Sequence, residues 1–412
     1  MPKWLVWTSQ AFLGLLFMFS GVVKGIDPMG TAIKIGEYLS AFGISAGEVW
    51  STVLAFVLID FEFFLGLLIF AGVWRKTMTW ILVVFMFPMT LLTLYIAIAN
   101  PVADCGCFGD ALKISNADTF WKNVIIYALA VVLFSSPGKM YRMVPDRLGW
   151  VVLIAGFVFT NHGFIRQYKG HLPVIDFRPY KVGSDLYALT QAGKDGEYDF
   201  RFVYEKDGKE RVFTMDELAN ADSTWTYVRD ETVELTPPVD PPGADLVLLD
   251  REGTPVTPEL AQKGANALLF VNTDLSRLDT DEAQRIIDIV HALGEKVTLV
   301  MSESFEAVDR GDFGDKAVIF DEVLYLDRST SHTLVRSHPS AVVVVGDGTI
   351  ARKMTSGEFR SYIEDLSTAD GLYQPDPRPD HHRDLFFGFL AAGLLCLLGS
   401  GLYFRHKGFT QQ

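Results

Sequence analysis

The sequence has few cysteines and fewer basic than acidic residues. Three cysteines stand in 412 residues, far short of a disulfide framework. Cys105 and Cys107 are close together, whereas Cys396 lies in an apolar run, where a thiol usually serves as packing. With 36 Lys and Arg against 50 Asp and Glu, the formal net charge of −14 argues against a nucleic-acid partner.

The balance of apolar and charged residues indicates that one part of the chain lies in a membrane and another part in water. They make up 49% of the chain, and the mean hydropathy is +0.22, yet 21% of the residues are charged. Because a membrane-crossing helix needs about 20 apolar residues, the sequence predicts six spans, at about 4–24, 49–73, 77–99, 119–137, 147–164 and 384–404. We expect the first span to be retained, since no small-x-small cleavage site follows it.

The distribution of Lys and Arg predicts how these spans are oriented. With six spans, the basic residues of the short loops all fall on one side, which is then the cytoplasm: Lys3, Arg75, Lys76, Lys139, Arg142, Arg147, Arg405 and Lys407. The chain is therefore expected to be a multi-pass bacterial inner-membrane protein with both termini in the cytoplasm. Loops 25–48 and 100–118 and the whole segment 165–383 would lie in the periplasm.

The chain divides into a membrane part and an exported part. Residues 1–137 form the predicted four-helix bundle, 138–164 contain a fifth span and 384–404 form a C-terminal span. Residues 165–243 contain a β-hairpin at 200–213, with Asp207-Gly208 at its turn, and end in a Pro-rich linker at 236–243.

Residues 244–375 read as an α/β domain. Strands are predicted at 267–271, 297–301, 341–345 and 350–354 and a helix at 280–293. The order resembles the thioredoxin fold, including Pro339 where that fold places a cis-proline. Where a redox-active member would carry Cys-x-x-Cys, this sequence has NTDLSR at 272–277, so this domain has no thiolate for exchange. It is then a docking module or a relic that only adds stability.

The exported loop after the third span contains DCGCFGD at 104–110. Two cysteines around one glycine can close only a small, strained ring, and such bonds suit electron transfer better than structural stapling. A structural disulfide or a metal site that also uses His162 are the alternatives. Asp104 and Asp110 would raise rather than lower the pKa of a neighbouring thiol.

Three runs of the first 137 residues resemble one membrane family. They are FSGVVKGIDP at 19–28, DCGCFGD at 104–110 and FWKN at 120–123, and they look like the DoxX-related family of MauE, the methylamine utilisation membrane protein. The version with an exported domain entered through LPVIDFRPYKVG at 172–183 is similar to proteins of the Bacteroidota. The resemblance implies disulfide formation or electron delivery to exported proteins, and DoxX relatives imply a link to quinones.

Two carboxylates stand inside the second predicted span. Asp60 and Glu62 are costly in a bilayer and therefore expected to be functional. Glu62 shares a helix face with Gly66, which would allow another helix to approach closely, and Lys24 is a partner for either carboxylate. A structural ion pair and proton handling beside a quinone both account for this set.

These features predict an inner-membrane thiol–disulfide redox component. Cys105 and Cys107 would exchange electrons with a periplasmic protein or a thioredoxin-like carrier, with Lys24, Asp60, Glu62, Asp104 and Asp110 as supporting polar residues. A quinone is the candidate cofactor, no metal is expected, and the bundle would work in the lipid bilayer, within a membrane complex. The alternatives are a non-catalytic assembly or maturation factor whose exported domain docks a partner, and a transporter subunit.

Overall fold

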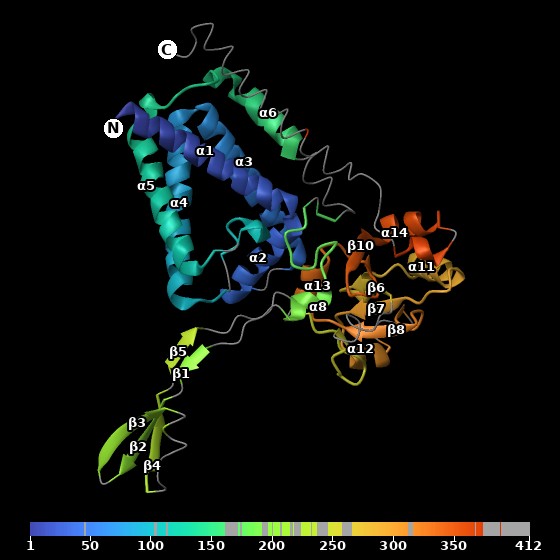
Figure 1. Cartoon of the computed structure of the whole chain (residues 1–412). Helices are drawn as coiled ribbons and strands as arrows, with labels where there is room; N and C mark the ends of the chain where they lie inside the picture. Colours follow the sequence, from blue (N-terminus) through green and yellow to red (C-terminus); the bar gives the residue numbers. More distant parts are fainter. Residues whose placement is uncertain are drawn as a thin grey trace.

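The computed structural model describes residues 1–44, 47–102, 105–112, 114–160, 172–173, 175–191, 197–199, 201–206, 208–214, 217, 224–231, 233–236, 246–257, 266–311, 316–366, 368–373 and 388. Three parts are recognisable in Figure 1: a helical bundle at the N-terminus, small β-sheets in the middle of the chain, and a sheet with helices near the C-terminal end.

Four long helices form the bundle: α1 (Lys3–Ile26), α3 (Glu48–Ala71), α4 (Arg75–Ala99) and α5 (Asn116–Ser135). Each is long and apolar enough to cross a membrane. Large apolar side chains are exposed along their outer faces, as expected for contact with lipid, among them Trp4, Phe12, Phe19, Val57, Phe87, Leu91, Ile98, Trp121 and Ile125. The first four predicted helices are therefore confirmed, and they fit a membrane-embedded bundle.

Glycines let α1 and α3 touch backbone to backbone. A Cβ added to Gly66 would lie 2.5 Å from the backbone nitrogen of Met18, and one on Gly21 would lie 2.7 Å from that of Phe63. Small residues at such crossings allow close van der Waals packing, which replaces the hydrophobic drive that lipid removes. The predicted role of Gly66 as a point of close approach is confirmed.

The loop expected at 25–48 contains a helix, α2 (Pro28–Ala41). Asp27 caps it by accepting a hydrogen bond from the Gly30 amide, and Pro28 occupies its first turn, where no amide proton is needed. Figure 1 shows α2 at the end of the bundle where α1 finishes.

The fifth and sixth predicted spans are tested only in part. Helix α6 (Gly149–Thr160) occupies the first part of the 147–164 prediction, and residues 161–164 lie outside the described residues. The 384–404 prediction, with Cys396, also lies outside them except for residue 388.

Five strands between 197 and 236 form two small antiparallel sheets. Strand β1 (Glu197–Asp199) pairs with β5 (Val233–Thr236), while β2 (Arg201–Lys206) lies between β3 (Lys209–Thr214) and β4 (Thr226–Asp230). Lys206 pairs with Lys209 and Gly208 has a φ of 73°, which confirms the hairpin predicted from Asp-Gly.

The larger sheet has the strand order β10-β9-β6-β7-β8. Its strands are β6 (Ala267–Asn272), β7 (Thr298–Met301), β8 (Glu322–Tyr325), β9 (Ser340–Val344) and β10 (Ile350–Thr355). The first three are parallel, and β9 and β10 are antiparallel to their neighbours. Four of these strands were predicted, and β8 was missed.

Both faces of this sheet are covered. Leu268 and Phe270 of β6 pack into the core beneath α11 (Thr280–Ala292) and α14 (Ser356–Ile363). The alternate residues Leu269 and Val271 join a second core with Tyr180 and the segment at 246–248. Strands buried on two faces read as continuous apolar runs, which is why β6 was readable from the sequence.

The short helices complete the architecture. They are α8 (Leu186–Gln191), α12 (Phe305–Asp309) and α13 (Arg328–Leu334), with 3-10 turns η1 (Gly109–Ala111), η2 (Pro137–Lys139), η3 (Asp146–Leu148), η5 (Leu275–Arg277) and η7 (Ala369–Gly371). The peptide bond between His338 and Pro339, just before β9, is cis, as the resemblance to the thioredoxin fold implied.

Candidate functional site

The Cys-Gly-Cys loop connects α4 to α5 at the end of the bundle that holds α2. Asn100 ends α4 in the left-handed conformation, and the side chain of Asn116, at the start of α5, donates hydrogen bonds to Asn100 and to the carbonyl of Val102. The two ends of the loop are thereby tied together. Gly106 has a φ of 63°, which a side chain would make unfavourable.

Helices α1 and α2 hold the loop at both cysteines. The Tyr38 hydroxyl donates to the Cys105 carbonyl over 2.8 Å, and the Ser20 hydroxyl lies 2.9 Å from the Cys107 carbonyl. A Cβ on Gly106 would come within 3.1 Å of the Lys34 side chain. Contacts from α1 and α2 therefore fix the backbone of Cys105 and Cys107, and both thiols lie on a rigidly held turn.

The two cysteines differ in environment. Both are free thiols, with Cys105 buried and Cys107 half-buried. The Cys105 thiol donates a hydrogen bond to the Cys107 sulfur, and this bond, followed by the positive charges of Lys122 and Lys24, lowers the pKa of Cys107 to about 6 against the opposing effect of burial. The same hydrogen bond, together with burial, raises the pKa of Cys105. Cys107 is the better nucleophile, because the thiolate is the reactive form.

Lys122 reaches the pair from α5. Its Nζ lies 4.5 Å from the centre of the Phe108 ring, a distance at which a cation is attracted to an aromatic face. The Phe108 ring is buried and packs beside Phe19 with 5.8 Å between ring centres. This packing holds the ammonium group next to the loop. Lys122 was not predicted as a site residue, although it stands within the FWKN run.

A buried ion pair lies directly behind the loop. Lys24 Nζ is 2.6 Å from Glu62 Oε2, and both side chains are less than a tenth exposed. Ser20 accepts a hydrogen bond from Lys24 and lies 2.7 Å from the same carboxylate oxygen. The structure thus brings Lys24 and Glu62 together and connects them through Ser20 to Cys107.

The other predicted polar residues are placed elsewhere. Asp60 accepts a hydrogen bond from Thr160 of α6, so it faces away from Lys24. Asp104 lies outside the described residues, as does His162, and Asp110 is described only as part of η1. Among the residues that the structure describes, no group of three or more His, Cys, Asp or Glu could hold a metal ion.

The quinone expected from the resemblance does not fit beside the ion pair. Gly21 of α1 lies against the backbone of Phe63, the residue after Glu62, and Gly66 of α3, one turn beyond Glu62, lies against the backbone of α1. The polar groups there are already occupied, because Lys24 binds Glu62 and Ser20 binds both of them. A quinone there would have to separate α1 from α3.

Comparison with known families gives two matches along the chain. Residues 2–136 match the family model of methylamine utilisation protein MauE, and residues 198–235, which contain most of the two small sheets, match a domain of unknown function, DUF8463. No curated protein and no solved structure matches the chain. The first match covers about a third of the 412 residues, with all four long helices and both cysteines inside it. The N-terminal bundle is therefore similar to the MauE family of membrane proteins, as its sequence runs indicated.

Proposed function

We propose that this chain is an inner-membrane thiol–disulfide exchange protein whose working pair is Cys105 and Cys107. The observation that carries the proposal is the asymmetry of the two thiols. The half-buried Cys107 has a pKa lowered by the Cys105 hydrogen bond and by the charges of Lys122 and Lys24, and Cys105 lies buried beside it as the second thiol. A structural disulfide would need no such difference between its sulfurs.

The exchange conserves atoms and electrons. The Cys107 thiolate attacks one sulfur of a disulfide in an exported partner, forming a mixed disulfide and releasing one partner thiolate, which takes up a proton. Cys105 then loses its proton and attacks the Cys107 sulfur, forming the Cys105–Cys107 disulfide and freeing the second partner thiol. Two electrons pass from the pair to the partner, and the reverse sequence oxidises a partner dithiol.

The fold of the exported domain supports a docking role in this exchange. We infer a thioredoxin-like fold from three parallel strands next to an antiparallel pair, with helices packed on the sheet. The segment that follows β6 has no cysteine, and residues 272–274 of it line a pocket against the α1–α2 junction instead. Such a domain contributes recognition rather than a second thiol pair. The positive-inside distribution of Lys and Arg supports a periplasmic location for this domain and for the Cys-Gly-Cys loop.

The test is to trap the partner with one cysteine at a time. In a Cys396→Ala background the pair holds the only thiols of the chain. Cys105→Ser leaves the nucleophile without its resolving thiol and should accumulate a mixed disulfide in intact cells. Cys107→Ser is the matched control and should accumulate much less. Equal trapping by both variants, or by neither, would overturn the assignment.

A second measurement separates exchange from the rival functions. Alkylation of Cys105 and Cys107 in intact cells, with and without a reductant, reports whether the pair cycles. A transporter or an assembly factor should keep its function in the Cys105→Ser/Cys107→Ser double variant, whereas an exchange protein should lose it. A pair that stays oxidised under every condition contradicts the proposal.

A further inference from the structure

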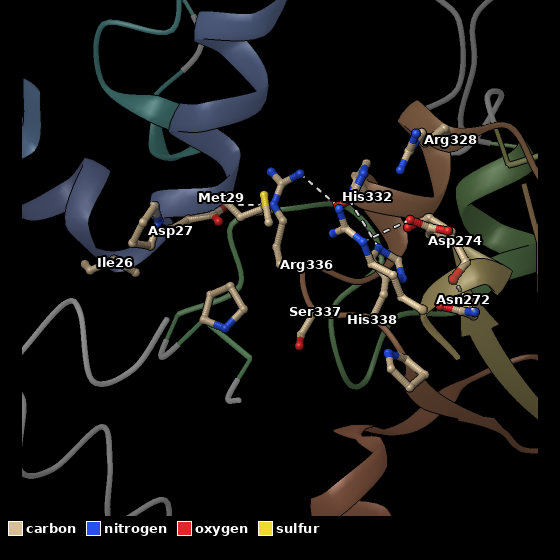
Figure 2. A pocket seen from close by; sticks show the side chains of 15 residues that line it. Ile26, Asp27, Met29, Asn272, Asp274, Arg328, His332, Arg336, Ser337 and His338 are labelled. Atoms are coloured by element: carbon tan, nitrogen blue, oxygen red, sulfur yellow. Dashed lines mark hydrogen bonds and ion pairs between the residues drawn. The ribbon is translucent and has the colours of Figure 1, made fainter. Parts of the chain in front are cut away.

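A pocket of about 220 Å³ lies where the exported domain meets the bundle. Its walls come from residues 26–29 at the α1–α2 junction, residues 272–274 after β6, and α13 with residues 336–339 that follow it. Figure 2 shows Asp27 and Met29 on one side and Arg328, His332 and Asp274 on the other, with Arg336 between them. Since α1 is long and apolar enough to cross a membrane and ends at Ile26, the pocket lies at the level of a membrane surface.

Three guanidinium groups and two carboxylates line this pocket. Arg336 Nε lies 2.7 Å from Asp27 Oδ2, and both side chains are about a tenth exposed or less. Arg277 Nε lies 3.2 Å from Asp274 Oδ2. Two of the three positive charges are therefore matched by the two negative ones.

Arg328 supplies the third charge. It is exposed at the start of α13, and it donates no hydrogen bond to any residue within the described part of the chain. Its charge reaches Asp274 only through space. Its guanidinium therefore keeps its five donor positions for a ligand.

Two histidines add polar groups without adding charge. His332 and His338 contact each other, with 3.2 Å between Nε2 of His338 and Nδ1 of His332. Burial, and next the charge of Arg336, lower the pKa of His332 to about 4, while burial and next His332 lower the pKa of His338 to about 3. Both rings are neutral at physiological pH and offer ring N–H groups and lone pairs.

We propose that this pocket binds a phosphate-type oxyanion, with Arg328 as the residue that binds its charge. A guanidinium matches the spacing of phosphate oxygens and donates two parallel hydrogen bonds to them. One uncompensated positive charge beside neutral imidazoles suits a small anion. The anion is either free phosphate or the phosphate of a lipid headgroup, which basic pockets at membrane surfaces are known to bind.

The binding test uses the full-length chain purified in a neutral detergent. Inorganic phosphate is titrated against chloride at equal ionic strength, and the midpoint of thermal unfolding is recorded. Phosphatidylglycerol is added in a second arm, and bound lipid is counted by native mass spectrometry. We expect Arg328→Gln to weaken the apparent affinity for the bound species roughly tenfold or more.

Arg285→Gln is the matched control, because Arg285 is exposed on α11 of the same domain and does not line the pocket. Loss of the phosphate response in Arg328→Gln alone identifies free phosphate, and loss of lipid binding in that variant alone identifies a headgroup. No binding in either arm, or equal losses in both variants, overturns the proposal. The Cys105→Ser/Cys107→Ser variant should bind as the wild type does, so this result is independent of thiol exchange.

Discussion

Lys24 Nζ lies 2.6 Å from Glu62 Oε2 inside the bundle, and Ser20 joins this ion pair to the backbone of Cys107. The serine hydroxyl has one proton, so it donates either to the carboxylate or to the Cys107 carbonyl at a given moment while it accepts from Lys24. The position of the thiol loop therefore depends on a buried charge pair in the helices behind it. A change in that pair should affect both stability and thiol chemistry.

Removing the carboxylate should destabilise the bundle. Glu62→Leu leaves the Lys24 ammonium buried without its counter-ion, and breaking a buried pair from one side costs about 3–5 kcal/mol. We expect a clearly lower midpoint of thermal unfolding for the purified protein in detergent. The double variant Lys24→Met/Glu62→Leu removes the unpaired charge and should recover most of the loss.

Asp60→Asn is the control for this change, because Asp60 stands two residues away on the same helix and bonds to Thr160 instead. The asparagine keeps an acceptor for that hydroxyl, so a small effect is expected. A Glu62→Leu protein that unfolds at the wild-type midpoint would show that the pair contributes no stability.

The reactivity of Cys107 should follow a low pKa. Thiolate is present above the pKa, so the rate of alkylation at Cys107 should rise with pH and reach half its maximum near pH 6. Cys105→Ala removes the hydrogen bond that lowers this pKa most, and Lys122→Gln removes the next contribution. A rise of about one pKa unit lowers the thiolate fraction at pH 6 roughly fivefold.

Rates would be measured in the Cys396→Ala background across pH 5 to about 9, near the ordinary cysteine pKa, with the modified cysteine located by peptide mass spectrometry. Lys76→Gln, an exposed lysine at the start of α4, is the control for loss of charge alone. A wild-type profile with its midpoint above pH 8, or an equal shift in Lys76→Gln, would contradict the predicted environment.

The sequence predicted the elements whose signals are local. Four apolar stretches predicted the long helices of the bundle, and Asp207-Gly208 predicted the hairpin. Helix α2 was missed although its start signal is present, since Asp27 followed by Pro28 is typical of a helix N-terminus. Strand β8 is only four residues long and begins with a charged residue, Glu322. Its sequence therefore shows neither the alternation of apolar and polar residues nor the continuous apolar run that predicts a strand.

The site was predictable only as far as its residue types allowed. Cys105 and Cys107 were identified from their spacing, and Lys24 with Glu62 from the cost of charge in a bilayer. The contacts of Tyr38 and Lys122 with the loop depend on how α2 and α5 pack, and no local pattern encodes that. The pairing of Asp27 with Arg336 joins residues 309 positions apart, so it follows from the tertiary fold alone.

A side chain at Gly66 should force α1 away from α3. The added Cβ of Gly66→Ala would lie 2.5 Å from the backbone nitrogen of Met18, which cannot move without moving the helix. Overpacking of this kind costs about 1–3 kcal/mol, and thermal unfolding in detergent would measure it. Gly47→Ala is the control, because a Cβ there meets no atom within 4 Å. Equal stability of the two variants would show that the helices are less tightly packed.

Breaking the contact between Asp27 and Arg336 should loosen the C-terminal α/β domain from the bundle. Arg336→Met removes the ion-pair partner of the buried Asp27 carboxylate, which keeps the hydrogen bond from the Gly30 amide. A hydrogen bond between charged groups contributes about 2 kcal/mol, which corresponds to roughly thirtyfold more frequent opening. Hydrogen–deuterium exchange of the amides at 26–31 and 332–338 should therefore accelerate by about that factor.

Arg229→Met is the control, because it removes a pair of the same type that is half exposed on β4. It should leave the exchange rates of both segments unchanged. Wild-type exchange rates in Arg336→Met would mean that other contacts hold the domain in place.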